Sequence, residues 1–425
     1  MMRKFFNLSL LLSMLFFLLV GCKNKTENTT NEKVTIDVFQ FKVEFKDKFT
    51  EIAKEYMKEN PNVTINVTTV GGGDDYGPAL KTRFSSGNEP TIFNVGGPQD
   101  VSDYMSKLED LTNVNLAKQA LPKTLDGVTV DGKVYGLPFN QEGYGFVYNK
   151  AVFEKAGIKA EEITTYAKLV EAVNVLDSKK AELGLKAVFA LPAKETWVTG
   201  LHLSNVFLSP EFDGNINKVF ESKTVEFKYA NQFKNILDLQ NKYSVQPTVS
   251  LDYSQQVEKL FSTGKVAMIQ QGNWILNSVE QIDPELAKNI GFIPIHVEGV
   301  AEGKLPVGVP MYWAINKNKD EATKKAAIAF LEWMYTSEKG KEYVLNEFKF
   351  IPAYNGYDET KILDPLAKDI YKYSKEGNTI NWVFMGYPSG WGMNVLGAEI
   401  QRYVSGQTTW EKVIQTAKDS WQQDR

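Results

Sequence analysis

The stretch PFNQEGYGFVYNKAVFEK, residues 138–155, places two extended segments and a helix close together in the chain. Its first residue is a proline, which disfavours helix in the residue before it and so favours an extended chain there. Residues 146–148 form a short apolar strand, and Asn149 is a candidate N-cap for a helix that ends at Gly157. The polar loop between the extended segments carries Glu142, and we expect the chain to pass from one lobe to another at this loop.

Composition narrows the classes of function that need to be considered. A chain of 425 residues with 43% hydrophobic residues is long enough for two domains, and its net charge of -4 gives no reason to expect a nucleic-acid partner. It contains 2 His and 1 Cys, too few for a His- or Cys-ligated metal, a Cys–His nucleophile or a disulfide framework. We therefore expect no metal and no cofactor. Aromatic residues are plentiful, with 8 Trp, 19 Tyr and 25 Phe.

The N-terminus has the pattern of an export signal. An apolar segment, residues 5–20, is too short for a comfortable membrane span and leads into Leu19-Val20-Gly21-Cys22. This resembles a bacterial lipobox, and Cys22 is the only cysteine. We predict a lipoprotein signal peptide over residues 1–21, lipidation of Cys22 and a flexible polar tether over 22–33. The alternative is an ordinary secretory signal or an anchor helix with an incidental cysteine. The prediction places the protein at the extracellular face of the cell membrane, held by acyl chains.

The body alternates between β-rich and helical patterns. Strands are expected at residues 34–41, 63–70, 91–95, 187–191, 261–269, 291–295 and 306–315, and helices at 45–57, 76–86, 164–176, 231–241, 255–261, 320–335 and 410–421. This order indicates right-handed crossovers and parallel α/β sheets. In such sheets ligands bind at the carboxyl ends of the strands.

Polar residues near those strand ends are the first candidates for ligand contacts: Gln40, Lys42, Glu44, Asp74 and Gln99. Asp74 belongs to the loop GGGDD, residues 71–75, which could be mistaken for a phosphate-binding loop. The loop lacks the Lys and Ser/Thr of a P-loop, and its acids would repel phosphate. A flexible connection is the favoured interpretation, and a ligand contact from Asp74 or Asp75 is the alternative.

The opening stretch also carries a family resemblance. Pro-Phe-Asn, then Gly145, Tyr148-Asn149, Phe153 and Lys155 follow at the spacing of the signature of bacterial family 1 extracellular solute-binding proteins. These are the sugar-binding components of ABC importers. Residues 264–274, with GKVAM followed by Gly-x-Trp, and residues 333–338, WMYTSE, resemble two further blocks of the same family.

The resemblance implies an α/β, periplasmic-binding-protein-like fold with two interleaved lobes and a ligand cleft between them. The expected N-terminal lobe is 34–141 plus 298–337, and the expected C-terminal lobe is 142–297 plus 338–425. Crossings between the lobes are expected near Gln141, Val297 and Ser337.

The chemistry of sugars suggests which residues would form the site. Sugars have apolar C–H faces that stack on aromatic rings, and hydroxyls that carboxylates and amides satisfy. The candidates for stacking are Trp197, Trp274 and Trp391, with Trp382 a weaker one; Glu142, Gln40, Lys42, Glu44 and Gln99 would bind hydroxyls.

By resemblance, family members often use an acid at the position of Glu142 and aromatic residues where Trp197 and Trp274 stand. Gly96-Gly97-Pro98 departs from relatives, which often have a charged or aromatic contact there. Each Trp has packing as its alternative, and Trp333 and Trp421 are assigned to packing because they lie in amphipathic helices.

The expected function is a lipid-anchored, monomeric receptor that binds a carbohydrate, closes over it by hinge rotation and delivers it to the permease subunits of an ABC importer. The many tryptophans favour an oligosaccharide, and no catalysis is expected. One alternative is an exported glycoside hydrolase, which would need two acids at the right separation. Another is a receptor of the same fold for a polyamine or ferric iron.

Overall fold

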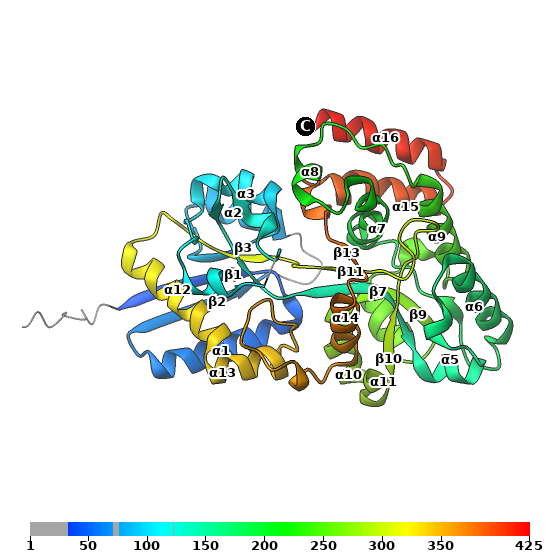
Figure 1. Cartoon of the computed structure of the whole chain (residues 1–425), viewed down its shortest axis with the longest axis horizontal. Helices are drawn as coiled ribbons and strands as arrows, with labels where there is room; N and C mark the ends of the chain where they lie inside the picture. The colour runs from blue at the N-terminus through cyan, green and yellow to red at the C-terminus, as the bar shows by residue number, and fades with distance from the viewer. Residues whose placement is uncertain (1–32, 71–75, 122) are drawn as a thin grey trace, which may run out of the picture. The chain divides into compact units, whose positions relative to one another are not determined.

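Two β-sheets, each covered by helices, form the body of the protein in the computed structural model, which describes residues 33–70, 76–121 and 123–425 (Figure 1). The region Val34–Arg425 forms one compact unit that contains every strand described below. The predicted signal peptide, Cys22, most of the tether, Asp74 and Asp75 lie outside the described residues.

The first sheet has the strand order β2-β1-β3-β12-β6. Its strands are β1 (Val34–Gln40), β2 (Val63–Thr69), β3 (Ile92–Val95), β6 (Leu137–Pro138) and β12 (Tyr312–Ile315). The strands β1, β2 and β3 are parallel, as the strand–helix–strand pattern predicts, whereas β12 runs antiparallel to both β3 and β6.

The second sheet has the order β13-β11-β7-β9-β8, and β10 also pairs with β7. Its strands are β7 (Glu142–Asn149), β8 (Ala187–Phe189), β9 (Val266–Gly272), β10 (Ile290–Ile293), β11 (Leu305–Gly308) and β13 (Thr379–Asn381). Only the pairs β8–β9 and β11–β13 are parallel, so the expectation of a parallel sheet is wrong here. The reason is the direction of the strands: β7 runs away from the first sheet, whereas β9, β10 and β11 run back toward the first sheet. Each of these three strands therefore pairs antiparallel with β7. A separate hairpin joins β4 (Thr129–Val130) to β5 (Lys133–Val134).

The α-helices are α1 (Lys46–Glu59), α2 (Tyr76–Ser85), α3 (Pro98–Tyr104), α4 (Asn115–Gln119), α5 (Lys150–Ala156), α6 (Tyr166–Lys179), α7 (Ser204–Leu208), α8 (Ile216–Glu221), α9 (Ala230–Lys242), α10 (Leu276–Ile282), α11 (Pro284–Lys288), α12 (Glu321–Thr336), α13 (Glu338–Glu342), α14 (Pro365–Lys375), α15 (Ala398–Val404) and α16 (Trp410–Gln423). Val198–Leu203, Gln255–Phe261 and Trp391–Gly397 are π-helical. The predicted signals of α5 are confirmed: the Asn149 side chain accepts a hydrogen bond from the Val152 amide, and Gly157 ends the helix at φ 76°.

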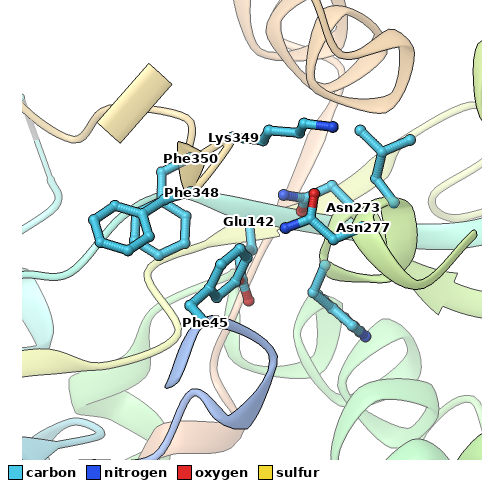
Figure 2. A pocket seen from close by; sticks show the side chains of 9 residues that line it. Phe45, Glu142, Asn273, Asn277, Phe348, Lys349 and Phe350 are labelled. Carbon is cyan, nitrogen blue, oxygen red and sulfur yellow. The ribbon is translucent and has the colours of Figure 1, made fainter. Parts of the chain in front are cut away.

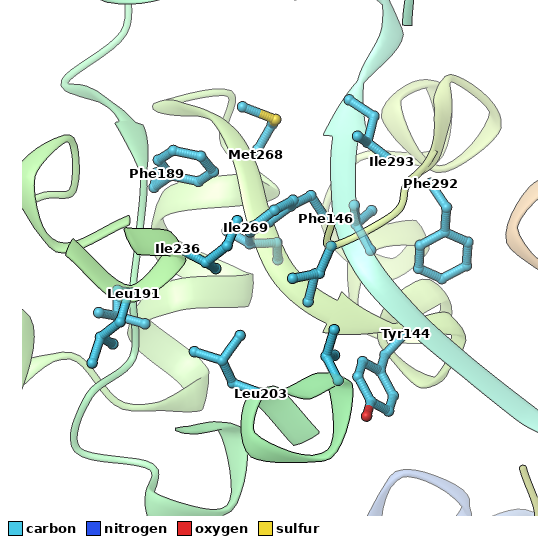
Figure 3. Packing of buried hydrophobic residues seen from close by; sticks show 14 of the residues in the cluster. Tyr144, Phe146, Phe189, Leu191, Leu203, Ile236, Met268, Ile269, Phe292 and Ile293 are labelled. Atoms are coloured by element: carbon cyan, nitrogen blue, oxygen red, sulfur yellow. The ribbon is translucent and has the colours of Figure 1, made fainter. Parts of the chain in front are cut away.

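Each sheet has its own hydrophobic core. In the first, α1 and α12 lie against the sheet and bury residues such as Phe49, Trp313 and Phe330. In the second, the central strands β7 and β9 contribute Phe146 and Met268, and Figure 3 shows them packed with side chains from the surrounding helices. We call the first sheet with its helices the first lobe, and the second sheet with its helices the second lobe.

The chain passes between the lobes three times, and the structure moves two of the expected crossings. The first passage joins β6 to β7 through residues 139–141, as predicted at Gln141. The second joins β11 to β12 through residues 309–311 instead of lying at Val297, because β11 pairs with β7 and β13 of the second sheet. Residues 306–315 are therefore two strands of different sheets, and not one. Pro310, which has no amide N–H, lies at the break.

The third crossing follows Tyr354 instead of lying near Ser337. Phe348 and Tyr354 are buried in the first core, whereas Ile362 is buried in the second. The first crossing is fixed by tyrosines of this segment and of α12: the Tyr354 hydroxyl donates to the Pro138 carbonyl at 2.5 Å, and the Tyr335 hydroxyl to the Phe139 carbonyl at 2.6 Å.

Candidate ligand site

A cavity of about 610 Å³ lies between the two lobes. The first lobe contributes Gly96, Lys123, Thr124, Asp126, Gly127 and Tyr312. The second lobe contributes Asp213, Gly214, Asn215, Ile216, Asn217, Val307, Gly308, Ser374, Thr379, Asn381, Trp382 and Met385. Gln141 and Val309, which belong to the first and second crossings, complete the lining. Small-molecule sites in proteins have volumes of this order. The lining combines amides, carboxylates and hydroxyls with aromatic rings, and so suits a polar ligand with apolar faces.

The polar wall of the second lobe is held in place by its own hydrogen bonds. The Asn215 side chain caps α8 by accepting from the amides of Asn217 and Lys218. The Asn381 amide donates to the Gly214 carbonyl at 3.0 Å, which joins the end of β13 to the loop before α8. These contacts fix the position of residues that line the cavity.

The acid of the first lobe differs from an ordinary surface carboxylate. Asp126 follows Lys123 in the connection before β4, and both line the cavity. Partial loss of hydration raises the pKa of Asp126, against the attraction of Lys123. A carboxylate in such a setting accepts hydrogen bonds from hydroxyls.

Trp382 is the largest apolar side chain among the residues that line the cavity. It is 7% exposed and lies against Gly308, where a Cβ atom would come within 2.4 Å of the indole. Glycine is therefore required at position 308 for the ring to lie over β11. The ring centroid of Trp382 is 5.4 Å from that of Tyr144 and 5.6 Å from that of His202.

The ring contacts continue from Trp382 through His202 to two further tryptophans. His202 stacks on Tyr144 with ring centroids 4.4 Å apart, and its ring lies 5.2 Å from both Trp197 and Trp274. Burial, assisted by the charge of Lys42, lowers the pKa of His202 to about 3. The imidazole is therefore neutral at physiological pH.

This aromatic group ends at a buried ion pair between the lobes. Lys42 follows β1 and Glu142 begins β7; their side chains form a salt bridge, and both are buried. The Lys42 ammonium lies 5.8 Å from the Trp274 ring, and the Asn140 amide donates to Glu142 at 3.2 Å. Burial raises the pKa of Glu142, and the attraction of Lys42 opposes the shift.

A second, smaller cavity of about 10 Å³ lies beside Glu142 and has room for about one water molecule. Figure 2 shows the Glu142, Asn273 and Asn277 side chains together with the rings of Phe45, Phe348 and Phe350. The Asn273 side chain accepts a hydrogen bond from the Gly143 amide at 3.0 Å. It thus orients the backbone next to Glu142.

The structure brings most of the sequence-predicted residues together. Lys42, Glu142, Trp197 and Trp274 form the group just described. Gln40 supports it, because its side chain accepts from the Lys42 amide at 2.6 Å and donates to Thr69 at 2.5 Å. Glu44 is partly exposed and close enough for its charge to raise the pKa of Glu142.

Two predicted residues lie elsewhere. Trp391 is fully buried, donates to the Ala417 carbonyl at 2.9 Å and packs 4.7 Å from the ring of Trp421. Its neighbouring glycines indicate close helix packing instead of a ligand loop, so its prediction as a stacking residue is corrected to a packing role. Gln99 bonds to Asp103 and Arg425 and does not line the large cavity. Trp333 and Trp421 pack as predicted.

Sequence analysis missed most of the polar lining: Lys123, Asp126, Asp213, Asn215, Asn217 and Asn381. Asp, Asn and Gly are the ordinary residues of turns, so Asp126, Asp213 and Asn215 carry no distinct signal. Asn217 and Asn381 lie in the short elements α8 and β13, which were not predicted. Trp382 was recognised only as a weaker candidate. Its position directly after β13 was the available signal, but this short strand was not predicted.

Neither a membrane-spanning helix nor a cluster of metal ligands is found among the described residues. Within 33–70, 76–121 and 123–425, no helix is long and apolar enough to cross a membrane. The same part of the chain shows no cluster of three or more His, Cys, Asp or Glu side chains that could hold a metal ion.

Two α/β lobes with a cavity between them and several chain crossings define the class of two-lobed binding-protein folds. Residues 42–341, more than half of the chain, match the profile of the family described as bacterial extracellular solute-binding protein. The chain belongs to this family.

Individual relatives agree with this assignment. The multiple sugar-binding protein of Streptococcus mutans serotype c is 26% identical over 348 residues, 77% of each chain. The melibiose/raffinose/stachyose-binding protein MelE of Bacillus subtilis is 23% identical over 342 residues, 78% of each chain.

Solved structures show the same fold. A chitin oligosaccharide binding protein has a TM-score of 0.76 at 20% identity and covers 92% of this chain and 98% of its own. The solute-binding protein RafE in complex with raffinose has a TM-score of 0.75 at 22% identity, with coverages of 92% and 99%.

Proposed function

We propose that this protein is a receptor that binds an oligosaccharide in the cavity between its lobes and delivers it to an ABC importer. The observation that carries the proposal is the lining of the 610 Å³ cavity, where carboxylates, amides and hydroxyls surround Trp382 and Tyr312. The relatives support it, because their names refer to sugars such as raffinose and stachyose.

The lining matches what a neutral oligosaccharide requires. Each hydroxyl that leaves water needs a replacement hydrogen bond, which Asp126, Asp213 and the cavity asparagines supply. The apolar face of a sugar ring needs a flat apolar partner, which Trp382 supplies. Polar groups on both lobes allow one ligand to contact both, so binding favours the closed arrangement of the lobes.

The ligand leaves chemically unchanged in this proposal. Glu142 is engaged by Lys42, and Asp126 and Asp213 serve as hydrogen-bond acceptors. The closed, loaded protein is then the form that docks on the permease subunits of the importer, and it acts as a monomer.

Lipidation of Cys22 would hold the receptor at the extracellular face of the membrane. The lipobox-like Leu19-Val20-Gly21-Cys22 supports this part of the proposal. Cys22→Ser should abolish incorporation of labelled palmitate and move the protein from the membrane fraction to the medium of the host cell. Unchanged membrane association of the variant would overturn the anchor.

Calorimetry on the chain beginning at Lys23, which retains the compact unit Val34–Arg425, tests the proposal. The ligands are neutral mono-, di-, tri- and tetrasaccharides, with spermidine and ferric citrate as the alternatives. We expect saturable one-site binding of an oligosaccharide, weaker binding of its monosaccharide units, and no product by chromatography of the recovered sugar. Cleaved sugar would establish the hydrolase instead, and binding of only spermidine or iron would change the ligand class.

A further inference from the structure

We infer that Gly97 and Gly127 form a seat on which the second lobe docks, and that the lack of a side chain at Gly97 sets how tightly the lobes close. The inference rests on the proposed function and concerns a contact at the rim of the cavity. It gives a physical reason for the glycine at position 97 of Gly96-Gly97-Pro98.

The seat belongs to the first lobe. Gly97 precedes α3, and Gly127 lies in the turn before β4; both are buried. A Cβ atom on Gly97 would lie 2.7 Å from the Cβ of Met385 and 3.1 Å from its carbonyl oxygen. Carbon atoms in favourable contact are about 3.5–4.0 Å apart, so even one methyl group at Gly97 would push Met385 away.

Ile216, at the start of α8, fills the space between the two glycines. Its Cδ1 would lie 3.5 Å from a Cβ on either Gly97 or Gly127. Met385 and Ile216 both belong to the second lobe, and α3 packs against α8 and against the turn Phe384–Gly386. Met385 thus occupies a position that even a methyl group at Gly97 would block, whereas Ile216 would remain at ordinary contact distance from a Cβ on either glycine.

A polar contact reinforces the seat at its outer edge. The Arg425 guanidinium, from the second lobe, donates to the Gln99 side chain of α3 at 3.0 Å and to the Gly386 carbonyl. The same group lies 5.6 Å from the Trp421 ring, which positions it. The contact between lobes therefore combines an apolar seat with one hydrogen bond.

Gly97→Ala is a clean test because the backbone at Gly97 is extended, with φ 173°, a conformation that alanine also adopts. Gly97 itself does not line the cavity, but Met385, which the new methyl group would displace, does, so the distance between the lobes is the decisive readout and the affinity follows it. If closure requires the seat, the variant holds less of the closed form, and the apparent Kd rises in inverse proportion to the closed fraction.

The experiment measures the distance between spin labels on Lys81→Cys of α2 and Lys412→Cys of α16, with and without sugar. Both positions are exposed, and the chain from Lys23 contains no other cysteine. We expect Gly97→Ala to lengthen the distance and to raise the Kd about fivefold or more, by the same factor for every sugar that binds. Ser102→Ala, on an exposed face of α3, is the matched control and should change neither quantity.

Gln99→Ala, which removes the hydrogen bond to Arg425 together with the bond to Asp103 of the same helix, should shift both quantities in the same direction by less. It replaces Gly97→Ala as the test if that variant does not fold. Unchanged distances and affinities in folded variants would overturn the inference. If the wild type binds no sugar while Gly97→Ala still lengthens the distance, the seat stands and the proposed function fails.

Discussion

At the scale of single residues, Trp382 is the side chain on which sugar binding depends most. We expect Trp382→Ala to weaken binding of the preferred oligosaccharide by about 1–3 kcal/mol, the loss typical of a large aromatic anchor. The reason is that Trp382 is the one tryptophan among the residues that line the large cavity. Calorimetry measures the affinity, and urea unfolding separates it from the stability lost with a buried ring.

Trp333→Ala is the matched control for this prediction. Trp333 is also partly buried, but it packs against Tyr56 and donates to Glu59 at 2.9 Å on the first lobe, away from the cavity. It should lower stability and leave the Kd unchanged. An equal loss of affinity in both variants would show that Trp382 acts through folding alone.

The Lys42–Glu142 pair predicts a stability effect that depends on pH. Removing one partner of a buried pair costs about 3–5 kcal/mol, so Lys42→Met should be destabilised at pH 8 by about that amount. Burial already raises the pKa of Glu142, and without Lys42 nothing charged opposes the shift. Because the folded-state pKa is above the unfolded value, the stability of the variant is greatest at low pH and is lost as pH rises through the folded-state pKa.

Urea unfolding at pH 5 and pH 8 checks this result. The deficit of Lys42→Met relative to the wild type should shrink at pH 5, as Glu142 takes up a proton. The double variant Lys42→Met/Glu142→Gln should show no such change with pH. A stability deficit of the same size at both pH values in Lys42→Met would contradict a buried Glu142 carboxyl with a raised pKa.

At the scale of elements, the N-cap residue of α14 is a buried acid, Asp364, and burial disfavours its charged form. The Asp364 side chain caps the helix by accepting from the Leu366 amide at 2.7 Å, but it is only 7% exposed. Burial raises its pKa from the ordinary 3.8 to about 7, against the helix amides and Lys349. Its contribution to stability is present below about pH 4 and is lost as pH rises through about 7.

Asp364→Asn keeps the cap and removes the charge. The variant should be more stable than the wild type at pH 8 by about 4 kcal/mol, and the difference should vanish near pH 4. Thermal unfolding of both proteins across this range measures it. A variant that is less stable at pH 8 would show that the carboxylate is well solvated in the folded state.

The elements also show how far sequence reasoning reaches. Strands such as β1 and helices such as α12 have strong periodicity, and their bounds were predicted to within a few residues. The stretch over β11 and β12 was predicted as one strand, because apolar residues continue through it and only the pairing partners separate the two sheets. Strand pairing between segments far apart in the sequence cannot be recognised from the local sequence pattern.

Of the ligand contacts named from the sequence that the structure describes, only the weaker candidate Trp382 lines the large cavity. Glu142, Trp197 and Trp274 lie in segments with family patterns, and the structure places them in one group with Lys42. Asp126 lies in a turn whose residues look ordinary and Asn381 ends the short strand β13, and only folding brings them to one cavity. Trp391 follows a turn in the sequence, yet helix packing encloses it.

At the scale of the whole molecule, the three crossings explain how one cavity receives residues from distant segments. Gln141 and Val309 belong to two of these crossings and line the cavity directly. A hinge made of short connections allows the lobes to rotate without changing either core. The family resemblance predicted that the two lobes are built from alternating segments of the chain, whereas the positions of the second and third crossings are known only from the structure.

The crystal structure of the protein with its tightest-binding oligosaccharide tests the central claim most directly. We predict an intact sugar in the cavity between the lobes, with one ring stacked on Trp382 and hydroxyls bonded to Asp126 and to asparagines of the second lobe. A sugar bound outside this cavity, or a cleaved sugar within it, would contradict the account.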